Sequence, residues 1–303
     1  MYNWAQRIVC NQLAGISFLR RIKDSLAPTL AQYQCTDYNF GVCRHHISAV
    51  RQFGSYAPVG QNIVEIGPGG NLGNAIVLIA SGARRVYCID NYRHLDFQSS
   101  RTDFYLQLVE KLIADPEILP VAISEEWDTE KALKAIEDAV YFSGGAVQLN
   151  TDRIQYMAPC DALCIPLEDR SVDMIFSHAV LEHVKHPARV CREFGRVLKP
   201  GGYISHVIDL RDHFDPDGLQ MLRYPTWLWN LMSSNSHGYV NRCRASHFEQ
   251  FFRESGFKVL QSEATKILKD IHRIPEFLCD EFAELSVEQL QILDLSIVGI
   301  RNG

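Results

Sequence analysis

Apolar positions along the chain alternate between short runs typical of buried strands and stripes with helical spacing. The runs predict strands at residues 62–67 and 85–90, and a mostly apolar helix at 74–81 lies between them. A strand, a short helix and a second strand within about 30 residues form one βαβ unit, whose two strands run parallel. The first predicted elements of the core therefore indicate an α/β fold.

The same pattern continues toward the C-terminus and completes a sheet. Further strands are predicted at 154–157, 172–177, 203–210, 257–260 and 295–300. Helices are predicted at 104–114, 129–141, 187–198 and 248–255. Together these elements predict an α/β fold with a Rossmann-like, seven-stranded and mostly parallel sheet that is flanked by helices.

Three segments lie outside this regular alternation. Residues 1–58 are helical in pattern and are expected to form an N-terminal lid or cap on a domain that spans residues 59–303. A helical insertion at about 97–150, after the second strand, is too long for a simple connection, and its apolar stripes fit either an extended lid or a homodimer interface. Residues 211–245 mix polar and aromatic side chains and are expected to form a second lid.

Composition and charge exclude several classes of protein. The chain has 303 residues, 47% of them hydrophobic, so it can bury a large core and needs no disulfide or structural metal to be stable. A net charge of -6 argues against a strongly basic nucleic-acid-binding protein. No apolar run reaches the ~18–20 residues that span a bilayer, and the first residues lack the apolar core of a signal peptide. Nine scattered cysteines indicate reduced thiols and a cytoplasmic location.

A glycine-rich loop follows the first predicted strand and reads Glu-Ile-Gly-Pro-Gly-Gly-Asn-Leu-Gly over residues 65–73. Glycines there let the backbone approach a ligand and turn sharply into a helix. Asp90 ends the next strand, where an acidic group can bind the ribose hydroxyls of a nucleotide. Leu72 stands where the dinucleotide fingerprint has its third glycine, and no phosphate-loop lysine follows. The loop therefore favours a cofactor without phosphates over NAD or ATP.

At these positions the chain resembles the class I S-adenosylmethionine-dependent methyltransferases, of the kind called methyltransferase type 11. Four features carry the resemblance, in the family's order, over roughly residues 60–210. They are Val-Glu-Ile-Gly-Pro-Gly-Gly at 64–70, Asp90, the segment from Asp161-Ala162 to Asp173, and Ser-His-Ala-Val-Leu-Glu-His-Val at 177–184 followed by Arg-Val-Leu-Lys-Pro-Gly-Gly at 196–202. The resemblance implies a methyltransferase enzyme.

The resemblance also implies S-adenosyl-L-methionine as the cofactor and supplies its contacts. The glycine loop would lie against the methionine part, the acid after the second strand against the ribose, and residues 161–162 against the adenine. Residues 177–178 would face the sulfonium and the acceptor. The cofactor-binding residues implied in this way are Glu65, Gly67, Pro68, Gly69, Asp90, Asn91, Asp161, Ala162, Ser177 and His178.

Methyl transfer from a sulfonium depends mainly on holding the acceptor in line with the methyl group. An oxygen acceptor usually also needs a base, and histidine suits that role near pH 7. The candidate bases are His178, His206 and His213, and Asp209 can fix the tautomer of a neighbouring imidazole. Two alternatives stay open, because His178 can be a polar residue that shapes the pocket and 209–213 can be a salt-bridged loop.

Two further stretches concern the acceptor. Ile-Asp-Leu-x-Asp-His at 208–213 and Asn-Arg-x-Arg at 241–244 resemble a group of bacterial methyltransferases from envelope and glycan contexts. The arginines at 242 and 244 can grip a carboxylate or phosphate in forked geometry, or they can be surface charge. The candidate substrate-binding residues are Arg211, Tyr239, Asn241, Arg242 and Arg244. Residues 211–245 are accordingly expected to be the acceptor-side lid.

No metal is expected. Some members of the family bind a divalent metal at Glu-x-x-Glu-His, but this chain has Ala179 where the first Glu would stand. Glu182 and His183 are therefore expected to cap or pack a local helix.

The sequence thus predicts a methyltransferase with a small or medium, anionic acceptor, and O-methylation of a sugar or glycan-linked substrate is its first choice. The alternatives are N- or O-methylation of a small metabolite or natural product and, from another class, a non-catalytic cofactor-binding partner protein. A nucleic-acid acceptor is not expected.

Overall fold

A seven-stranded sheet forms the centre of the computed structural model, which describes residues 4–14, 35–95, 102–120, 127–143, 146–215, 218–235 and 239–303. In spatial order the strands are β5 (Ile154–Met157), β2 (Arg85–Ile89), β1 (Asn62–Ile66), β6 (Val172–His178), β7 (Leu198–Asp209), β9 (Ile292–Arg301) and β8 (Phe257–Ile267). The first five run parallel, and β9 pairs antiparallel with both β7 and β8. The predicted Rossmann-like, mostly parallel sheet is confirmed.

The order of the strands creates a topological switch point. From β1 the chain continues outward through β2 to β5, and it then returns to β6 on the other side of β1. The connections after β1 and β6 therefore leave in opposite directions, which opens a crevice at the carboxyl ends of these two strands. In open α/β sheets this crevice is where ligands bind.

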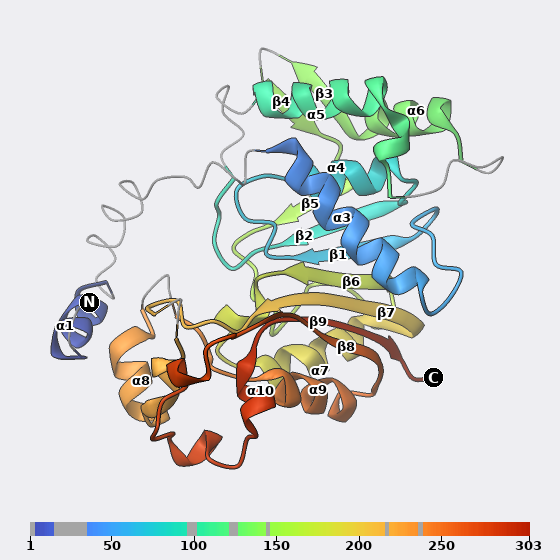
Figure 1. Cartoon of the computed structure of the whole chain (residues 1–303). Coiled ribbons are helices and arrows are strands. Elements are labelled where there is room, and N and C mark those ends of the chain that lie inside the picture. Colours follow the sequence, from blue (N-terminus) through green and yellow to red (C-terminus); the bar gives the residue numbers. More distant parts are fainter. Residues whose placement is uncertain are drawn as a thin grey trace.

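Helices cover both faces of the sheet, as Figure 1 shows. One face carries α3 (Thr36–Arg51) and α4 (Gly73–Ala80), and all eight residues of α4 are buried because the helix packs on the sheet with α3 on one side and the insertion helix α6 (Thr129–Ala139) on the other. The other face carries α7 (Pro187–Val197) and α9 (Ala245–Glu254). In α7 the apolar residues recur at helical spacing, and Val190, Cys191 and Phe194 enter the core.

The insertion after β2 packs onto the α4 side of the molecule. It contains α5 (Thr102–Ala114), η3 (Pro116–Ile118), α6 (Thr129–Ala139) and a two-stranded antiparallel sheet of β3 (Val140–Ser143) and β4 (Ala146–Leu149). This small sheet was not predicted, and the helix predicted at 129–141 ends at Ala139. Leu108 and Leu112 lie in the same core cluster as α4, whereas Leu106 and Ile113 are exposed. The homodimer interface stays a prediction.

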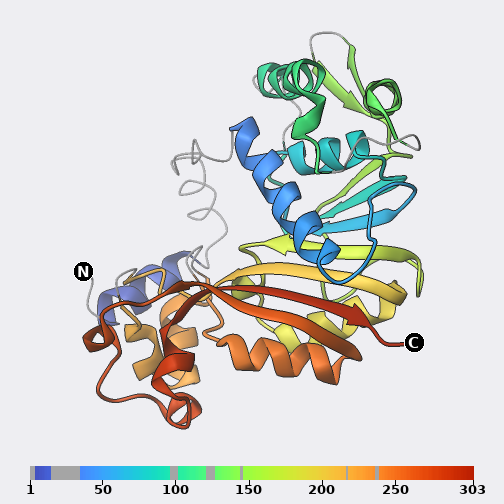
Figure 2. The same cartoon turned by 45° about the vertical axis from the view of Figure 1, so that its right-hand side comes forward.

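A third core cluster lies beside the carboxyl end of β7. Its elements are η5 (Gln220–Arg223), α8 (Thr226–Ser233), η6 (Ile271–Arg273), η7 (Asp280–Phe282) and α10 (Val287–Gln291), and Leu219, Trp229 and Phe282 are buried among them. The N-terminal helix α1 (Trp4–Ala14) packs against α8, where Asn11 Nδ2 donates to the Leu231 carbonyl at 2.9 Å. Figure 2 shows α1 next to α8, well away from α3. The two described helices of the N-terminal segment therefore contact different parts of the domain.

None of the helices in the described ranges is long and apolar enough to cross a bilayer. All nine cysteines are unpaired.

Candidate functional site

The glycine loop after β1 adopts a conformation that side chains disfavour. Gly67 and Gly69 have φ values of +70° and +69°. A Cβ on Gly67 would come within 2.6 Å of Val180 Cγ2, so the loop packs directly against the turn that follows β6. A Cβ on Gly69 would meet nothing within 4 Å. The loop thus presents open backbone at the switch point, as a closely approaching ligand requires.

Asp90 lies directly beside this loop, at the end of β2. Its Oδ2 accepts a hydrogen bond from the Gly69 amide at 3.2 Å, and its Oδ1 accepts one from the Tyr92 amide at 3.1 Å. Burial raises the pKa of this carboxyl, although the backbone donors and His94, 3.8 Å away, act in the opposite direction. Asn91 follows it and is exposed. Of the two residues assigned to the ribose, Asp90 therefore borders the glycine loop, and Asn91 follows it at the surface.

The segment after β5 lies along the other side of Asp90. The Asp90 amide donates to the Met157 carbonyl at 3.1 Å, and the Cys160 amide donates to the Asp90 carbonyl at 2.8 Å. Asp161 is exposed, and its Oδ1 accepts from the Leu163 amide at 2.9 Å. Ala162 packs on the second core cluster. The structure thus brings the residues assigned to the adenine next to those assigned to the ribose.

Glu65 lies beneath the glycine loop, where it is 4% exposed. Its Oε1 accepts a hydrogen bond of 2.6 Å from Asn74 Nδ2 of α4, and burial raises the pKa of the carboxyl to about 7. Asn39 of α3 donates to Asn74 Oδ1 at 2.8 Å and to Asn71 Oδ1 at 3.1 Å. Glu65 thus does not face the open side of the glycine loop. It belongs to a polar network that joins β1, α3, α4 and the loop and holds the loop in place.

The sequence reasoning missed Asn39 and Asn74 in this network. The available signal was an asparagine in the otherwise apolar run of α4, since a buried amide needs partners.

Ser177 and His178 end β6 and point to opposite faces of the sheet, as successive strand residues do. His178 Nδ1 lies 3.3 Å from His46 Nε2 of α3, and His46 Nδ1 lies 2.8 Å from Ser205 Oγ of β7. Burial lowers the pKa of His178 to about 4, and His45 adds to this effect. His178 therefore lies at the switch point as a neutral imidazole that His46 holds in place.

Ser177 does not reach the site as expected. Its side chain is fully buried, and Oγ lies 2.8 Å from His206 Nδ1 on the α7 and α9 face. The prediction that its side chain faces the sulfonium is wrong because the alternation of the strand turns it into the core.

His206 cannot be the general base that the sequence suggested. It is stacked between Phe194 and Phe252, with ring centroids 5.4 and 5.3 Å away and interplanar angles of 14° and 10°. Its exposed fraction is zero, and burial lowers its pKa to about 3. No acceptor can reach this ring, so His206 is a core residue.

Two arginines expected to bind the substrate are buried instead. Arg244 is 0% exposed and donates to the carbonyls of Leu210 at 2.6 Å and Leu290 at 2.7 Å, and also to that of Ile292. Arg242 donates to the Met221 carbonyl at 3.1 Å.

Arg242 also reaches the Tyr224 carbonyl, Thr226 Oγ1 at 2.7 Å and Glu281 Oε2 at 3.1 Å. The sequence left two interpretations of Arg242 and Arg244 open, binding of a substrate anion or free charge at the surface. Both are wrong, because the guanidinium groups donate their hydrogen bonds to oxygens of the protein itself.

Asn241 and Tyr239 support the turn after β6, which is the short helix η4 (Leu181–His183). Asn241 Nδ2 donates to the carbonyls of Leu181 at 2.7 Å and Val184 at 2.9 Å. The Tyr239 carbonyl lies 2.7 Å from His183 Nδ1. Asn241 was predicted to bind the substrate, but its side-chain Nδ2 is occupied by these two carbonyls.

Asp209 and Arg211 form the salt-bridged loop that was one of the two interpretations of this segment. Asp209 Oδ1 accepts from Arg211 Nε at 2.8 Å, and Oδ2 accepts from Nη2 at 2.5 Å. Burial alone would raise the pKa of Asp209, but hydrogen bonds from His213 and Arg211 outweigh it and lower the pKa. Asp209 Oδ2 also lies 3.3 Å from His213 Nε2, so the carboxylate orients both side chains.

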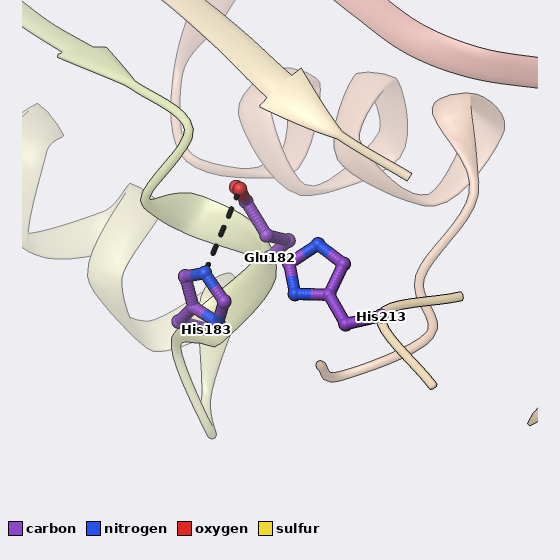
Figure 3. Close-up of side chains that lie close together, drawn as sticks. All are labelled: Glu182, His183 and His213. Atoms are coloured by element: carbon purple, nitrogen blue, oxygen red, sulfur yellow. Dashed lines mark ion pairs between the residues drawn. The ribbon is translucent and has the colours of Figure 1, made fainter. Parts of the chain in front are cut away.

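His213 faces the turn after β6, where Glu182 and His183 lie (Figure 3). Glu182 is 2% exposed, and among the described residues no side chain donates a hydrogen bond to its carboxylate oxygens. His183 Nε2 lies 3.8 Å from Glu182 Oε1, and the His183 and His213 ring centroids are 5.1 Å apart. One ligand-type atom from each of the three residues falls within 4.8 Å of the others. This cluster lies at the carboxyl ends of β6 and β7.

A family model described as a methyltransferase domain matches residues 128–205, which run from α6 into β7 and leave the glycine loop outside the match. Malonyl-[acyl-carrier protein] O-methyltransferase of Marinomonas sp. (strain MWYL1) is 43% identical over 44 residues. That match covers 14% of this chain and only 16% of the relative. The family match and the sheet topology confirm the resemblance to the class I methyltransferases.

Among solved structures, an S-adenosylmethionine-dependent methyltransferase from Mesorhizobium loti is similar over 88% of this chain and 98% of its own, at 17% identity and a TM-score of 0.45. A putative S-adenosylmethionine-dependent methyltransferase from Listeria monocytogenes is similar over 87% and 100%, at 13% identity and a TM-score of 0.43.

Proposed function

We propose that this chain, whose residues 128–205 match the methyltransferase domain, is an S-adenosylmethionine-dependent methyltransferase. One observation carries the proposal. The glycine loop, Asp90 and the segment at 157–162 meet at the carboxyl ends of β1, β2 and β5, beside the switch point of the sheet. An open backbone, a nearby carboxylate and an adjoining loop are what a nucleoside with a small charged tail needs.

The residues at this edge fit the cofactor. Gly69 leaves open space that the methionine part would fill, and Gly67 lets the loop pack closely on Val180. Asp90 would bind the ribose, and Asp161 with Ala162 would border the adenine. The loop offers no lysine for a phosphate, which agrees with a sulfonium cofactor. When bound, S-adenosylmethionine supplies an electrophilic methyl group, and the protein has to orient the acceptor and exclude water.

His178 is the base that the geometry favours for an oxygen acceptor. If its Nδ1–H donates to His46 Nε2, and His46 Nδ1–H donates to Ser205 Oγ, then Nε2 of His178 keeps a free lone pair. His46 is then a positioning residue, because it fixes this tautomer without touching the acceptor. Tyr38 and His45 of α3 lie beside the same ring, at centroid distances of 6.0 and 6.3 Å, so α3 forms one wall of the acceptor site.

For the acceptor we retain O-methylation of a sugar or glycan-linked substrate as the first choice. It rests on the resemblance of 208–213 and 241–244 to bacterial methyltransferases of glycan contexts, and the curated relative is itself an O-methyltransferase. The basis for an anionic acceptor is weaker than expected, since Arg242 and Arg244 are occupied. N- or O-methylation of a small metabolite is the alternative.

The test of the cofactor is a calorimetric titration with S-adenosylhomocysteine. Wild type should bind it, Asp90→Ala should lose at least about 10-fold in affinity, and the matched control Asp103→Ala, on the exposed side of α5, should bind like wild type. NAD is titrated in parallel. Binding of NAD instead of S-adenosylhomocysteine would overturn the proposal.

The test of the activity is transfer of a labelled methyl group to a panel of monosaccharides, glycans and small acids. Cofactor binding without transfer to any of them would favour the rival function, a non-catalytic cofactor-binding partner.

A further inference from the structure

Glu182 is buried, and no side chain of the described residues donates a hydrogen bond to its carboxylate, which the backbone amides of Glu182 and Asp209 face. Burial of an unpaired carboxylate is costly, so such a group either takes up a proton or is paired with a donor, a cation or a metal. In the described part of the chain no lysine or arginine forms an ion pair with Glu182. The imidazoles of His183 and His213 lie beside the carboxylate, as Figure 3 shows.

The protein holds His183 in the orientation of a metal ligand. Nδ1 of His183 lies 2.7 Å from the Tyr239 carbonyl, so this nitrogen carries the proton and donates it. Nε2 is then deprotonated and lies 3.8 Å from Glu182 Oε1. A backbone carbonyl behind a histidine is the usual outer partner of a ligating imidazole, because it fixes the tautomer and the ring plane.

The turn that carries these ligands is itself braced. The Asn241 amide donates to the Glu182 carbonyl at 2.7 Å, and the Asn241 side chain donates to the Leu181 and Val184 carbonyls. The residues that the sequence assigned to the substrate therefore hold the turn in place.

His213 arrives from a different element, the segment after β7. Asp209 Oδ2 lies 3.3 Å from its Nε2, which restrains the ring from behind or offers a further oxygen. One ligand-type atom each of Glu182, His183 and His213 lies within 4.8 Å of the others. Ligands at about 2.1 Å from one ion lie up to about 4.2 Å apart, so small side-chain rotations would complete the site.

We propose that Glu182, His183 and His213 form a binding site for one divalent transition-metal ion. Two imidazoles and one carboxylate suit Zn²⁺, Co²⁺, Fe²⁺ or Mn²⁺ rather than Mg²⁺ or Ca²⁺, which prefer oxygen ligands throughout. Three protein ligands leave coordination positions open, and the exposed side of His183 lets water or an acceptor oxygen reach them. The ligand set differs from Glu-x-x-Glu-His, because Ala179 has no side-chain atom that can bind a metal and His213 is the third ligand.

The use of this ion rests on the proposed function. The site lies at the carboxyl ends of β6 and β7, at the same edge as His178. An ion held by these residues would make an acceptor hydroxyl lose its proton more readily, and His178 or water would take up that proton. The acceptor oxygen would then bond to the methyl carbon as the carbon–sulfur bond of the cofactor breaks, which would give a methyl ether and S-adenosylhomocysteine. A pair of neighbouring oxygens, such as a sugar diol, is the acceptor chemistry that such an ion selects.

The test uses untagged full-length protein, stripped with a chelator and titrated with Zn²⁺ by calorimetry and with Co²⁺ by visible absorption. Wild type should bind one equivalent and gain thermal stability on Zn²⁺ addition. Glu182→Gln and His213→Ala should each bind at least about 10-fold more weakly. The matched control His186→Ala removes an exposed histidine near the same turn and should leave binding unchanged.

Absence of stoichiometric binding by wild type would overturn the site, and so would equal binding by wild type and Glu182→Gln. Glu182→Gln keeps the size of the side chain and removes the buried charge, so it should stay folded, and its melting curve without metal checks this.

The titrations contain no S-adenosylmethionine, so they fail or succeed independently of the proposed function. Metal binding without methyl transfer would reject only the methyltransferase. Binding of S-adenosylhomocysteine without metal binding would reject only the metal site.

Discussion

The cofactor edge and the acceptor edge of the sheet behave differently, although both lie at the carboxyl ends of parallel strands. At the cofactor edge, Gly69, Asp90 and the segment at 157–162 lie together as the sequence predicted. At the acceptor edge, three of the predicted site residues are buried and bind other groups of the protein, namely Arg242, Arg244 and His206.

The cofactor edge depends on backbone, whose position follows from the end of a strand and a glycine turn. The acceptor edge depends on side chains, whose partners come from distant segments. Residue type alone therefore locates a site well in the first case and poorly in the second.

Arg244→Ala is expected to have the largest effect and would sharpen this comparison. The substitution leaves the buried carbonyls of Leu210 and Leu290 without a donor, which should lower the free energy of unfolding by about 4 kcal/mol. Arg253→Ala, on the exposed face of α9, which begins directly after Arg244, removes only a surface pair with Glu249 and should cost under about 1 kcal/mol. Denaturant unfolding measures both. A stable Arg244→Ala that has lost only acceptor binding would restore Arg244 as a substrate ligand.

His178→Asn should slow methyl transfer by about 100-fold, since a positioned base contributes on the order of 10²–10⁴. His46→Asn should lower kcat by a smaller factor with little change in KM, because it only orients His178. His272→Asn, which replaces an exposed histidine of η6, serves as the matched control for loss of a histidine. S-adenosylhomocysteine binding should persist in the His178 and His46 variants. Full activity of His178→Asn would leave alignment or the ion as the source of catalysis.

An effect of intermediate size is expected for His206, on how the free energy of unfolding depends on pH. Its folded pKa is about 3, below the ordinary value of 6.5, so the unfolded chain binds more protons between these values. The stability due to His206 is complete above pH 6.5 and is lost as the pH falls, by about 2 kcal/mol at pH 5.

Glu65, with its pKa raised to about 7, acts in the opposite direction over pH 7 to 4.5. The measurement is therefore the difference between wild type and His206→Gln in unfolding experiments at pH 7 and pH 5. The variant should lose less stability on acidification. Parallel curves for the two proteins would contradict the buried neutral imidazole.

Gly69→Ala against Gly60→Ala is the finest test of the cofactor edge. Both glycines have positive φ, +69° and +74°, and a Cβ at either meets nothing within 4 Å. Each variant should therefore lose about 1 kcal/mol of stability from backbone strain alone. Only Gly69→Ala should also lose about 10-fold in affinity for S-adenosylhomocysteine, because its Cβ enters the space assigned to the cofactor. Equal affinity in the two variants would place the cofactor elsewhere.

Local pattern was enough to predict most of the fold. Apolar runs and glycine stops located β1, α4, β2, β5, β6 and α7 to within a few residues. The hairpin of β3 and β4 escaped prediction because its four-residue strands pair only with each other and carry a weak pattern. The predicted strand at 257–260 extends to Ile267 in β8, since pairing with β9 sustains residues that are mostly polar and exposed.

By itself, the sequence determined the parallel βαβ core, the glycine loop and the acid at the end of β2. These features depend on short-range preferences, namely strand periodicity and the freedom of glycine at positive φ. Only the tertiary structure decided which polar side chains face a ligand.

In the folded chain, Ser177 and His206 point into the core, and Arg242 and Arg244 donate to backbone carbonyls. His46 lies beside His178, and His213 lies beside Glu182. Partners separated by tens to more than a hundred residues leave no local trace in the sequence, because burial and hydrogen bonding are fixed only when the chain packs.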